Sequence, residues 1–108
     1  MDKSLHEKLE TIENSLPEIE KQLSEIDISR DQTGYAEMAK KHSDVSIIVD
    51  LFKQWKNIVE EIKDAEELLE VEIDEDMKRE FEDIISKNKP KLDPLIQKIK
   101  VSLLPKDP

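Results

Sequence analysis

The feature that most constrains this chain is a regular spacing of apolar residues near its beginning. Seven apolar residues recur there at intervals of 4, 3, 4, 3, 4 and 3: Leu5, Leu9, Ile12, Leu16, Ile19, Leu23 and Ile26. This spacing places their side chains on one face of an α-helix, whereas a strand would alternate with period two. Pro17 lies inside the stripe, but the heptad phase continues beyond it. We therefore expect one bent helix, with a kink near Asn14 and Ser15.

The middle of the chain predicts a short helix followed by a long one. The stripe stops before Asp31, which is a suitable N-cap for a short second helix. Ser43 and Asp44 offer a further N-cap, and the 4, 3 spacing then resumes over residues 48–69, with Glu66 at one position of the apolar seam. Additional apolar residues widen this face. A wide face is typical of a helix that contacts two neighbours in a bundle.

The last third of the chain predicts another helix, which begins near Asp74 or Glu75. Its apolar face is interrupted by Pro90 and Pro94. Asp93 followed by Pro94 matches an N-cap with proline at the first helical position. We therefore expect this last helix to be kinked or broken near Pro90 and Pro94.

Together these elements predict an all-α protein, an antiparallel helical bundle of three long helices plus one short helix. We expect a helical domain over residues 1–102. Residues 103–108 would begin a linker to a second domain that is missing here, because the two prolines in this segment cannot continue a helix. The alternative is a long homodimeric coiled coil built on the heptad stripe. Phe52 and Trp55 favour the bundle, because large rings fit poorly into a narrow two-stranded seam.

The charge of the chain is unevenly distributed. With 27 acidic and 17 basic residues among 108, the formal net charge is −10. Residues 60–83 hold 13 acidic and 3 basic residues, whereas residues 84–108 hold 2 and 6. The acidic segment is either a solvated helical hairpin that keeps the protein soluble or a surface that steers toward a basic protein, and both can hold.

Direct contact with nucleic acid is not expected from this chain, because phosphate binding needs clustered cations and most of the surface has the opposite sign. The exception is a run of five lysines in the last helix: Lys87, Lys89, Lys91, Lys98 and Lys100. We interpret this run as the solvent face of that helix near its C-terminus, where cations complement the helix dipole.

No residue pattern predicts catalysis, a cofactor or a metal. The absence of cysteine excludes a disulfide framework, a thiol nucleophile and a zinc ribbon. The two histidines, His6 and His42, belong to different predicted helices and show no metal-ligand spacing. The acidic residues 74–76 lack the alternating ligands and central glycine of a calcium loop. There is no signal-peptide pattern and no apolar run near the ~18 residues of a membrane span, so we expect a cytoplasmic protein.

The end of the chain resembles a known protein family. The string Leu103-Leu104-Pro105-Lys106-Asp107-Pro108 is similar to the segment that joins the first and second domains in the bacterial peptide chain release factor 1 family. Three stretches upstream agree in register: Ser43-Asp44-Val45, the aromatic residue Trp55, and Asp64-Ala65-Glu66-Glu67-Leu68-Leu69. The resemblance covers essentially the whole chain, and the terminal string favours the factor that reads UAA and UAG.

The resemblance implies a role in translation termination on the ribosome. In the family, one loop reads the stop codon and a Gly-Gly-Gln motif triggers hydrolysis of peptidyl-tRNA. This sequence has neither motif, and its single glycine is Gly34. The resemblance therefore implies a non-catalytic N-terminal arm, monomeric by itself. Its partners would be the stalk-base protein of the large ribosomal subunit and the class II release-factor GTPase.

We hypothesise that the partner contact lies in the acidic stretch before the last helix, far from the exit at Pro108. The candidate partner-binding residues are Glu70, Glu72, Asp74, Glu75 and Asp76. The competing hypothesis is a stand-alone acidic coiled-coil scaffold or adaptor that dimerises through the Leu5 to Ile26 stripe.

Overall fold

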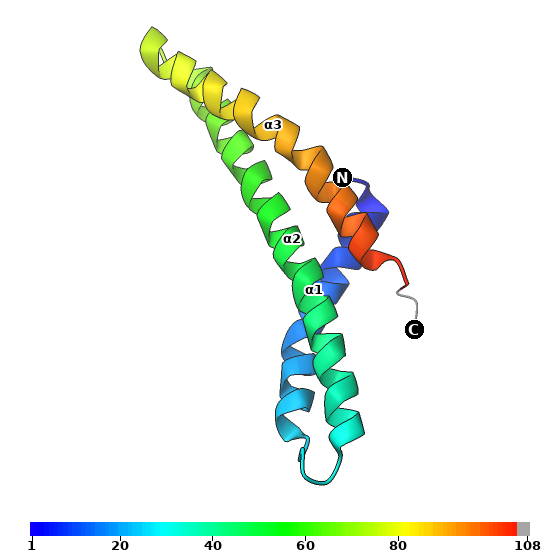
Figure 1. Ribbon diagram of the computed structural model, residues 1–108. Helices are drawn as coiled ribbons and strands as arrows, with labels where there is room; N and C mark the ends of the chain where they lie inside the picture. The colour runs from blue at the N-terminus through cyan, green and yellow to red at the C-terminus, as the bar shows by residue number, and fades with distance from the viewer. Residues whose placement is uncertain (106–108) are drawn as a thin grey trace. The chain divides into compact units, whose positions relative to one another are not determined.

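The computed structural model describes residues 1–105, and in this part of the chain it contains three α-helices and no strand. Helix α1 spans Lys3–Glu25, α2 spans Gln32–Val71 and α3 spans Glu75–Leu103 (Figure 1). The all-α prediction is confirmed. The predicted linker starts at the residue where α3 ends, and its last three residues, 106–108, lie outside the described residues.

Helix α1 is one continuous helix through Pro17, as the unbroken heptad phase predicted. The carboxylate of Asp2 caps its start by accepting a hydrogen bond of 3.2 Å from the backbone N–H of Leu5. The hydroxyl of Ser15 donates to the carbonyl of Ile12 at 2.6 Å, one turn before the proline. A bend of the helix axis at Pro17 stays a prediction.

The predicted short second helix does not exist as a separate element. Asp31 is the N-cap that the sequence predicted, with its carboxylate accepting from the N–H of Gly34 at 2.8 Å. From there α2 runs for 40 residues, straight through Ser43 and Asp44. The physical reason is that no proline interrupts residues 32–71 and the apolar spacing keeps one phase across the boundary. The modest preference of serine and aspartate for caps is too weak to end such a helix.

Gly34 lies in the first turn of α2 for a steric reason. A Cβ atom added at this position would collide with the carboxylate of Asp31, the group that caps the helix. The absence of a side chain lets that carboxylate fold over the N–H of Gly34. The low helix propensity of glycine is therefore offset by a closely fitted cap.

For the last helix the sequence predicted either a kink or a break near the prolines, and the structure excludes the break. Helix α3 is continuous for 29 residues and contains both Pro90 and Pro94. Each proline removes one backbone donor, but the two are four residues apart on one exposed face, where water can satisfy the freed carbonyls. The predicted start at Asp74 or Glu75 is confirmed. A kink of the helix axis at the prolines stays a prediction.

The chain divides into two compact units, which are described separately. The first unit comprises Met1–Asp50 together with the residues from Ser102 onward. Within it, α1 and the first part of α2 run side by side in opposite directions, in blue and cyan to green in Figure 1. Their buried apolar residues are Leu9, Ile19, Ile48 and Val49. The heptad stripe of α1 therefore supplies core residues within a single chain.

The second unit comprises Leu51–Val101, which is the rest of α2 and nearly all of α3. These two segments form an antiparallel hairpin, closed at the yellow end of α3 in Figure 1. Its buried residues are Phe52, Ile62, Ala65, Asn88, Leu95 and Ile99. The amide of Asn88 donates to the carbonyl of Ile84 at 2.8 Å, so this buried polar side chain is satisfied by its own helix.

Candidate functional site

The five acidic residues predicted as a partner contact lie together where α2 passes into α3. Glu70 is in the last turn of α2, Glu72 and Asp74 are in the connection, and Glu75 and Asp76 open α3. We call residues 70–76 the acidic turn. Within this turn Glu72 is half-buried, and the other four side chains are exposed.

Two of these carboxylates hold the backbone of the acidic turn. Oε1 of Glu72 accepts hydrogen bonds from the N–H groups of Ile73, at 3.1 Å, and Asp74, at 3.0 Å. Oδ1 of Asp74 accepts from the N–H of Asp76 at 2.9 Å, which is N-capping of α3. These N–H groups lie in the connection or in the first turn of α3, where no carbonyl of α3 can accept from them. Side chains therefore accept their hydrogen bonds. Glu72 and Asp74 therefore have a structural role, which the sequence hypothesis did not include.

The carboxylates of Glu75 and Asp76 lie in the first turn of α3. Glu75 is 3.5 Å from the amine of Lys78, and Asp76 is 3.8 Å from the guanidinium of Arg79. Exposed pairs of this kind contribute little to stability, so both carboxylates can be shared with a partner. Their negative charge also complements the N-terminal end of the helix dipole.

The acidic turn also exposes apolar side chains that the sequence analysis did not single out. Ile73 is 89% exposed and Val71 is 76% exposed, and Leu68 on the preceding turn of α2 is 49% exposed. In the string Glu70-Val71-Glu72-Ile73-Asp74, apolar and acidic residues alternate, a pattern that matches no helical face. That alternation is the signal by which these exposed apolar residues could have been found.

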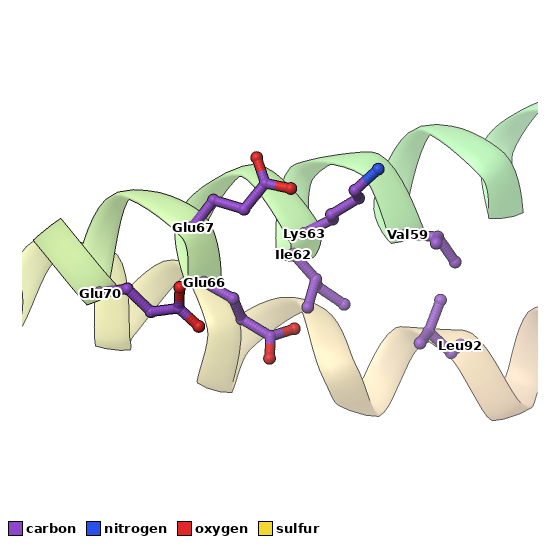
Figure 2. A pocket seen from close by; sticks show the side chains of 7 residues that line it. All are labelled: Val59, Ile62, Lys63, Glu66, Glu67, Glu70 and Leu92. Carbon is purple, nitrogen blue, oxygen red and sulfur yellow. The ribbon is translucent and has the colours of Figure 1, made fainter.

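A groove lies beside the acidic turn, between α2 and α3 of the second unit (Figure 2). It has a volume of about 390 Å³ and is lined by Val59, Ile62, Lys63, Glu66, Glu67, Glu70 and Leu92. We call it the α2–α3 groove. Figure 2 shows the side chains of Val59, Ile62 and Leu92 converging between the two helices. These three apolar side chains form the floor of the groove.

The rim of the groove carries acidic groups. Figure 2 shows the carboxylates of Glu66 and Glu70 on the side that faces α3, whereas Lys63 and Glu67 point away from it. Both Glu66 and Glu70 are exposed, and among the residues described neither is within hydrogen-bond or ion-pair distance of another side chain. Glu66 is the residue that occupied an apolar seam position in the sequence pattern. A carboxylate at that position leaves the seam open, which explains where the groove forms.

The predicted run of lysines lies on α3, and two of its members are engaged by their own helix. The amine of Lys87 is 2.8 Å from the carboxylate of Asp83, and this hydrogen bond raises the pKa of Lys87 above its ordinary value. The amine of Lys91 lies 3.4 Å from the side-chain oxygen of Asn88. Such contacts suit the solvent face that the sequence predicted.

The two histidines are not arranged for catalysis. The imidazole of His6 is 2.6 Å from Glu10 within α1, and that of His42 in α2 is 3.5 Å from Glu20 in α1. His42 thus lies inside a long helix, directly before Ser43, where the sequence predicted a boundary between two helices. Over residues 1–105, no group of three acidic or histidine side chains could hold a metal ion. None of the helices in the same range is long and apolar enough to cross a bilayer.

These features define a class: an all-α protein whose helical hairpin carries an exposed acidic turn and a groove. Comparison with known families is more specific. Residues 12–108 match the model of the PCRF domain. The chain therefore belongs to the PCRF domain family.

The chain is also similar to curated proteins named peptide chain release factor 1. It is 35% identical to the one from Caldicellulosiruptor bescii over 102 residues, which are 94% of this chain and 29% of that protein. It is 33% identical over 104 residues to the one from Clostridium beijerinckii, covering 96% of this chain and 29% of that protein. The chain thus spans less than a third of the length of these relatives. No solved structure gives a significant match.

Proposed function

We propose that this chain acts in translation termination as a non-catalytic helical arm of a release factor. The observation that carries the proposal is the match of residues 12–108 to the PCRF domain, together with the identity to proteins named peptide chain release factor 1. Codon reading and hydrolysis of peptidyl-tRNA would then belong to other domains.

We infer further that the factor is of the release factor 1 type, which reads UAA and UAG. The names of the relatives and the Leu103 to Pro108 string support this assignment. The place of action would be the cytoplasm, on the ribosome. The partners would be the stalk-base protein of the large subunit and the class II release-factor GTPase, with no direct contact to nucleic acid.

Charge supports the acidic turn as the surface that meets the stalk-base protein. Residues 60–83, which include the turn, carry 13 acidic and 3 basic residues, and such a field attracts a basic protein surface. Glu70, Glu75 and Asp76 are the exposed charges available for this contact. The exposed side chains of Val71 and Ile73 would add apolar contact area at its centre.

Binding to purified bacterial ribosomes tests the proposal. The variant Glu70→Lys/Glu75→Lys/Asp76→Lys reverses the exposed charges and leaves the turn-forming Glu72 and Asp74 intact. Exposed charge pairs contribute about 0.2–1 kcal/mol each, so the triple variant should bind about tenfold more weakly at low salt. The difference should shrink as salt is added, because surface charges are screened.

A matched control reverses three exposed acids of the first unit: Glu7→Lys, Glu25→Lys and Glu37→Lys. It changes the net charge equally and should bind like the parent. Ribosomes that lack the stalk-base protein should lose the difference between parent and triple variant. If the triple variant binds normally at low salt, the acidic turn is not the contact.

The oligomeric state separates this proposal from the scaffold hypothesis. Leu9 and Ile19 of the heptad stripe are buried within one chain, which leaves the stripe less apolar surface for a second copy. We therefore expect a monomer in analytical ultracentrifugation across a hundredfold range of concentration. A dimer that forms as concentration rises would favour the scaffold.

A further inference from the structure

We propose that the α2–α3 groove binds a protein segment by taking up one of its arginine side chains. The proposal concerns the flank of the hairpin, which shares only Glu70 with the acidic turn, and it goes beyond the role in termination. It begins with the composition of the groove, which combines an apolar floor with an acidic rim. An occupant must match both parts.

The floor requires an apolar portion in the occupant. Ile62 is buried, Val59 and Leu92 are half-buried, and all three side chains lie between the two helices (Figure 2). Covering this floor removes apolar area from water and is favourable. The methylene stem of a long cationic side chain can lie along it while the charged head stays at the rim.

The rim requires a cation. Glu66 and Glu70 are separated by four residues of α2, and like charges at this spacing destabilise a helix. Neither has an ion-pair partner in the described part of the chain, unlike Glu75 and Asp76 of the acidic turn. A cation held between Glu66 and Glu70 would turn this repulsion into attraction. The surrounding net charge of residues 60–83 would attract it from a distance.

Arginine fits this pair better than lysine. Its guanidinium presents five N–H donors in a planar fork, so it can donate to two carboxylates one helical turn apart. It is also less strongly hydrated than an ammonium group, which favours it over an apolar floor. The volume of about 390 Å³ is at the small end for ligand pockets and is suited to one side chain with its neighbours.

Other occupants fit less well. A phosphate or carboxylate ligand would be repelled by the rim. A purely apolar side chain would cover the floor but would force the two carboxylates to lose water without gaining a partner, which is costly. A partner segment with an arginine between apolar residues satisfies the floor and the rim together.

Nuclear magnetic resonance titration of the 108-residue chain can test this. The probe is the peptide acetyl-Leu-Arg-Leu-amide, and the comparison peptide carries citrulline, a neutral analogue of similar shape, in place of arginine. The arginine peptide should produce saturable shifts of the methyl signals of Val59, Ile62 and Leu92. The citrulline peptide should produce none at the same concentration.

Two double variants test whether peptide binding depends on the rim carboxylates. Glu66→Gln/Glu70→Gln should weaken binding about tenfold or more, because it removes both charge-assisted hydrogen bonds. The control Glu60→Gln/Glu61→Gln removes two exposed charges from the same segment, outside the groove, and should bind like the parent. The thermal unfolding temperature of each variant should be at least that of the parent, so that weaker binding cannot come from loss of the folded state.

Several outcomes would overturn the proposal. Equal affinity for the citrulline peptide, or normal affinity of the Glu66→Gln/Glu70→Gln variant, would exclude recognition of the charge by the rim. Shifts that gather at the acidic turn would place binding elsewhere. Groove shifts that appear on raising the protein concentration alone would identify a second copy as the occupant. A third peptide with lysine in place of arginine tests the choice of cation. Equal affinity for this peptide would overturn the assignment to arginine. None of these results depends on ribosome binding, so the two proposals can fail separately.

Discussion

The acidic turn and the α2–α3 groove are two carboxylate-rich regions a few residues apart, and they use their charges differently. In the turn, Glu72 and Asp74 accept hydrogen bonds from backbone N–H groups at 2.9 to 3.1 Å. At the groove, Glu66 accepts none within the described residues and points over an apolar floor. Glu70 belongs to both regions, because it lies in the last turn of α2 and lines the groove.

The difference follows from where the residues lie relative to helix ends. The N–H groups at the start of α3 have no acceptor in their own helix, so nearby carboxylates bond to them. Inside α2 each backbone N–H donates to the carbonyl four residues before it. No backbone N–H is therefore available to donate to a carboxylate there. An acidic side chain thus bonds to the backbone at a helix start, whereas inside a helix only other side chains or a partner can engage it. A count of acidic residues alone cannot tell the two apart.

The largest expected loss of stability comes from a substitution at the floor of the groove. Ile62→Ala removes a side chain that is only 6% exposed, and such truncations cost about 2–4 kcal/mol of unfolding free energy. Urea unfolding followed by circular dichroism measures this. Val59→Ala is the control, because Val59 is half-buried and should cost clearly less. Equal losses at both positions would mean that the difference in burial between Ile62 and Val59 does not determine their contributions to stability.

The next effect concerns the acidic turn. Asp74→Ala removes the N-cap of α3, and losing such a cap costs about 0.5–2 kcal/mol. Asp74→Asn keeps an acceptor oxygen and should retain most of the stability. Urea unfolding of the two variants at pH 7 checks the prediction. If Asp74→Ala is as stable as the parent, the turn does not depend on this carboxylate.

At the rim of the groove, a substitution is expected to stabilise the folded protein rather than destabilise it. Glu66→Gln removes one member of a like-charged pair four residues apart, which should raise the unfolding free energy by about 0.2–0.5 kcal/mol. The gain should fade at high salt, since the repulsion is screened. Thermal unfolding at low and high salt measures both effects. A loss of stability would show instead that Glu66 has a structural partner, and the comparison with the turn would fail.

The sequence predicted the helical faces well because they depend on local spacing. The heptad stripe of α1, the N-cap at Asp31 and the start of α3 near Asp74 all follow from residue order within one or two turns. The wrongly predicted helix boundary at Ser43 and the excluded alternative of a break near Pro90 have a common cause. A local signal for a helix end was given more weight than the apolar phase that continued across it.

The groove and the exposed apolar residues could be predicted only in part. Glu66 in an apolar seam indicated an irregularity between helices, but the spacing does not reveal how closely α2 and α3 approach there. For Val71 and Ile73, the alternation with acids is a signal that the sequence analysis did not use. Their exposure depends on how the connection folds back, which the carboxylate of Glu72 determines through two backbone hydrogen bonds.

A carboxylate in the connection between α1 and α2 gives the smallest effect and extends the comparison to a third region. Oδ1 of Asp27 accepts from the hydroxyl of Ser29 at 2.6 Å and from its N–H at 3.0 Å. These hydrogen bonds favour the charged form and lower the pKa of Asp27 below its ordinary 3.8. Since the folded state holds the lower pKa, this stabilisation is present above about pH 4 and is lost as the pH falls further.

Nuclear magnetic resonance titration of the Asp27 carboxyl carbon measures this pKa directly. Ser29→Ala removes the hydroxyl, the larger cause of the shift, and should move the pKa of Asp27 back toward 3.8. If Ser29→Ala leaves the pKa of Asp27 where it was, the hydroxyl does not hold this carboxylate. The contrast between engaged and available acids would then be confined to the α2–α3 hairpin.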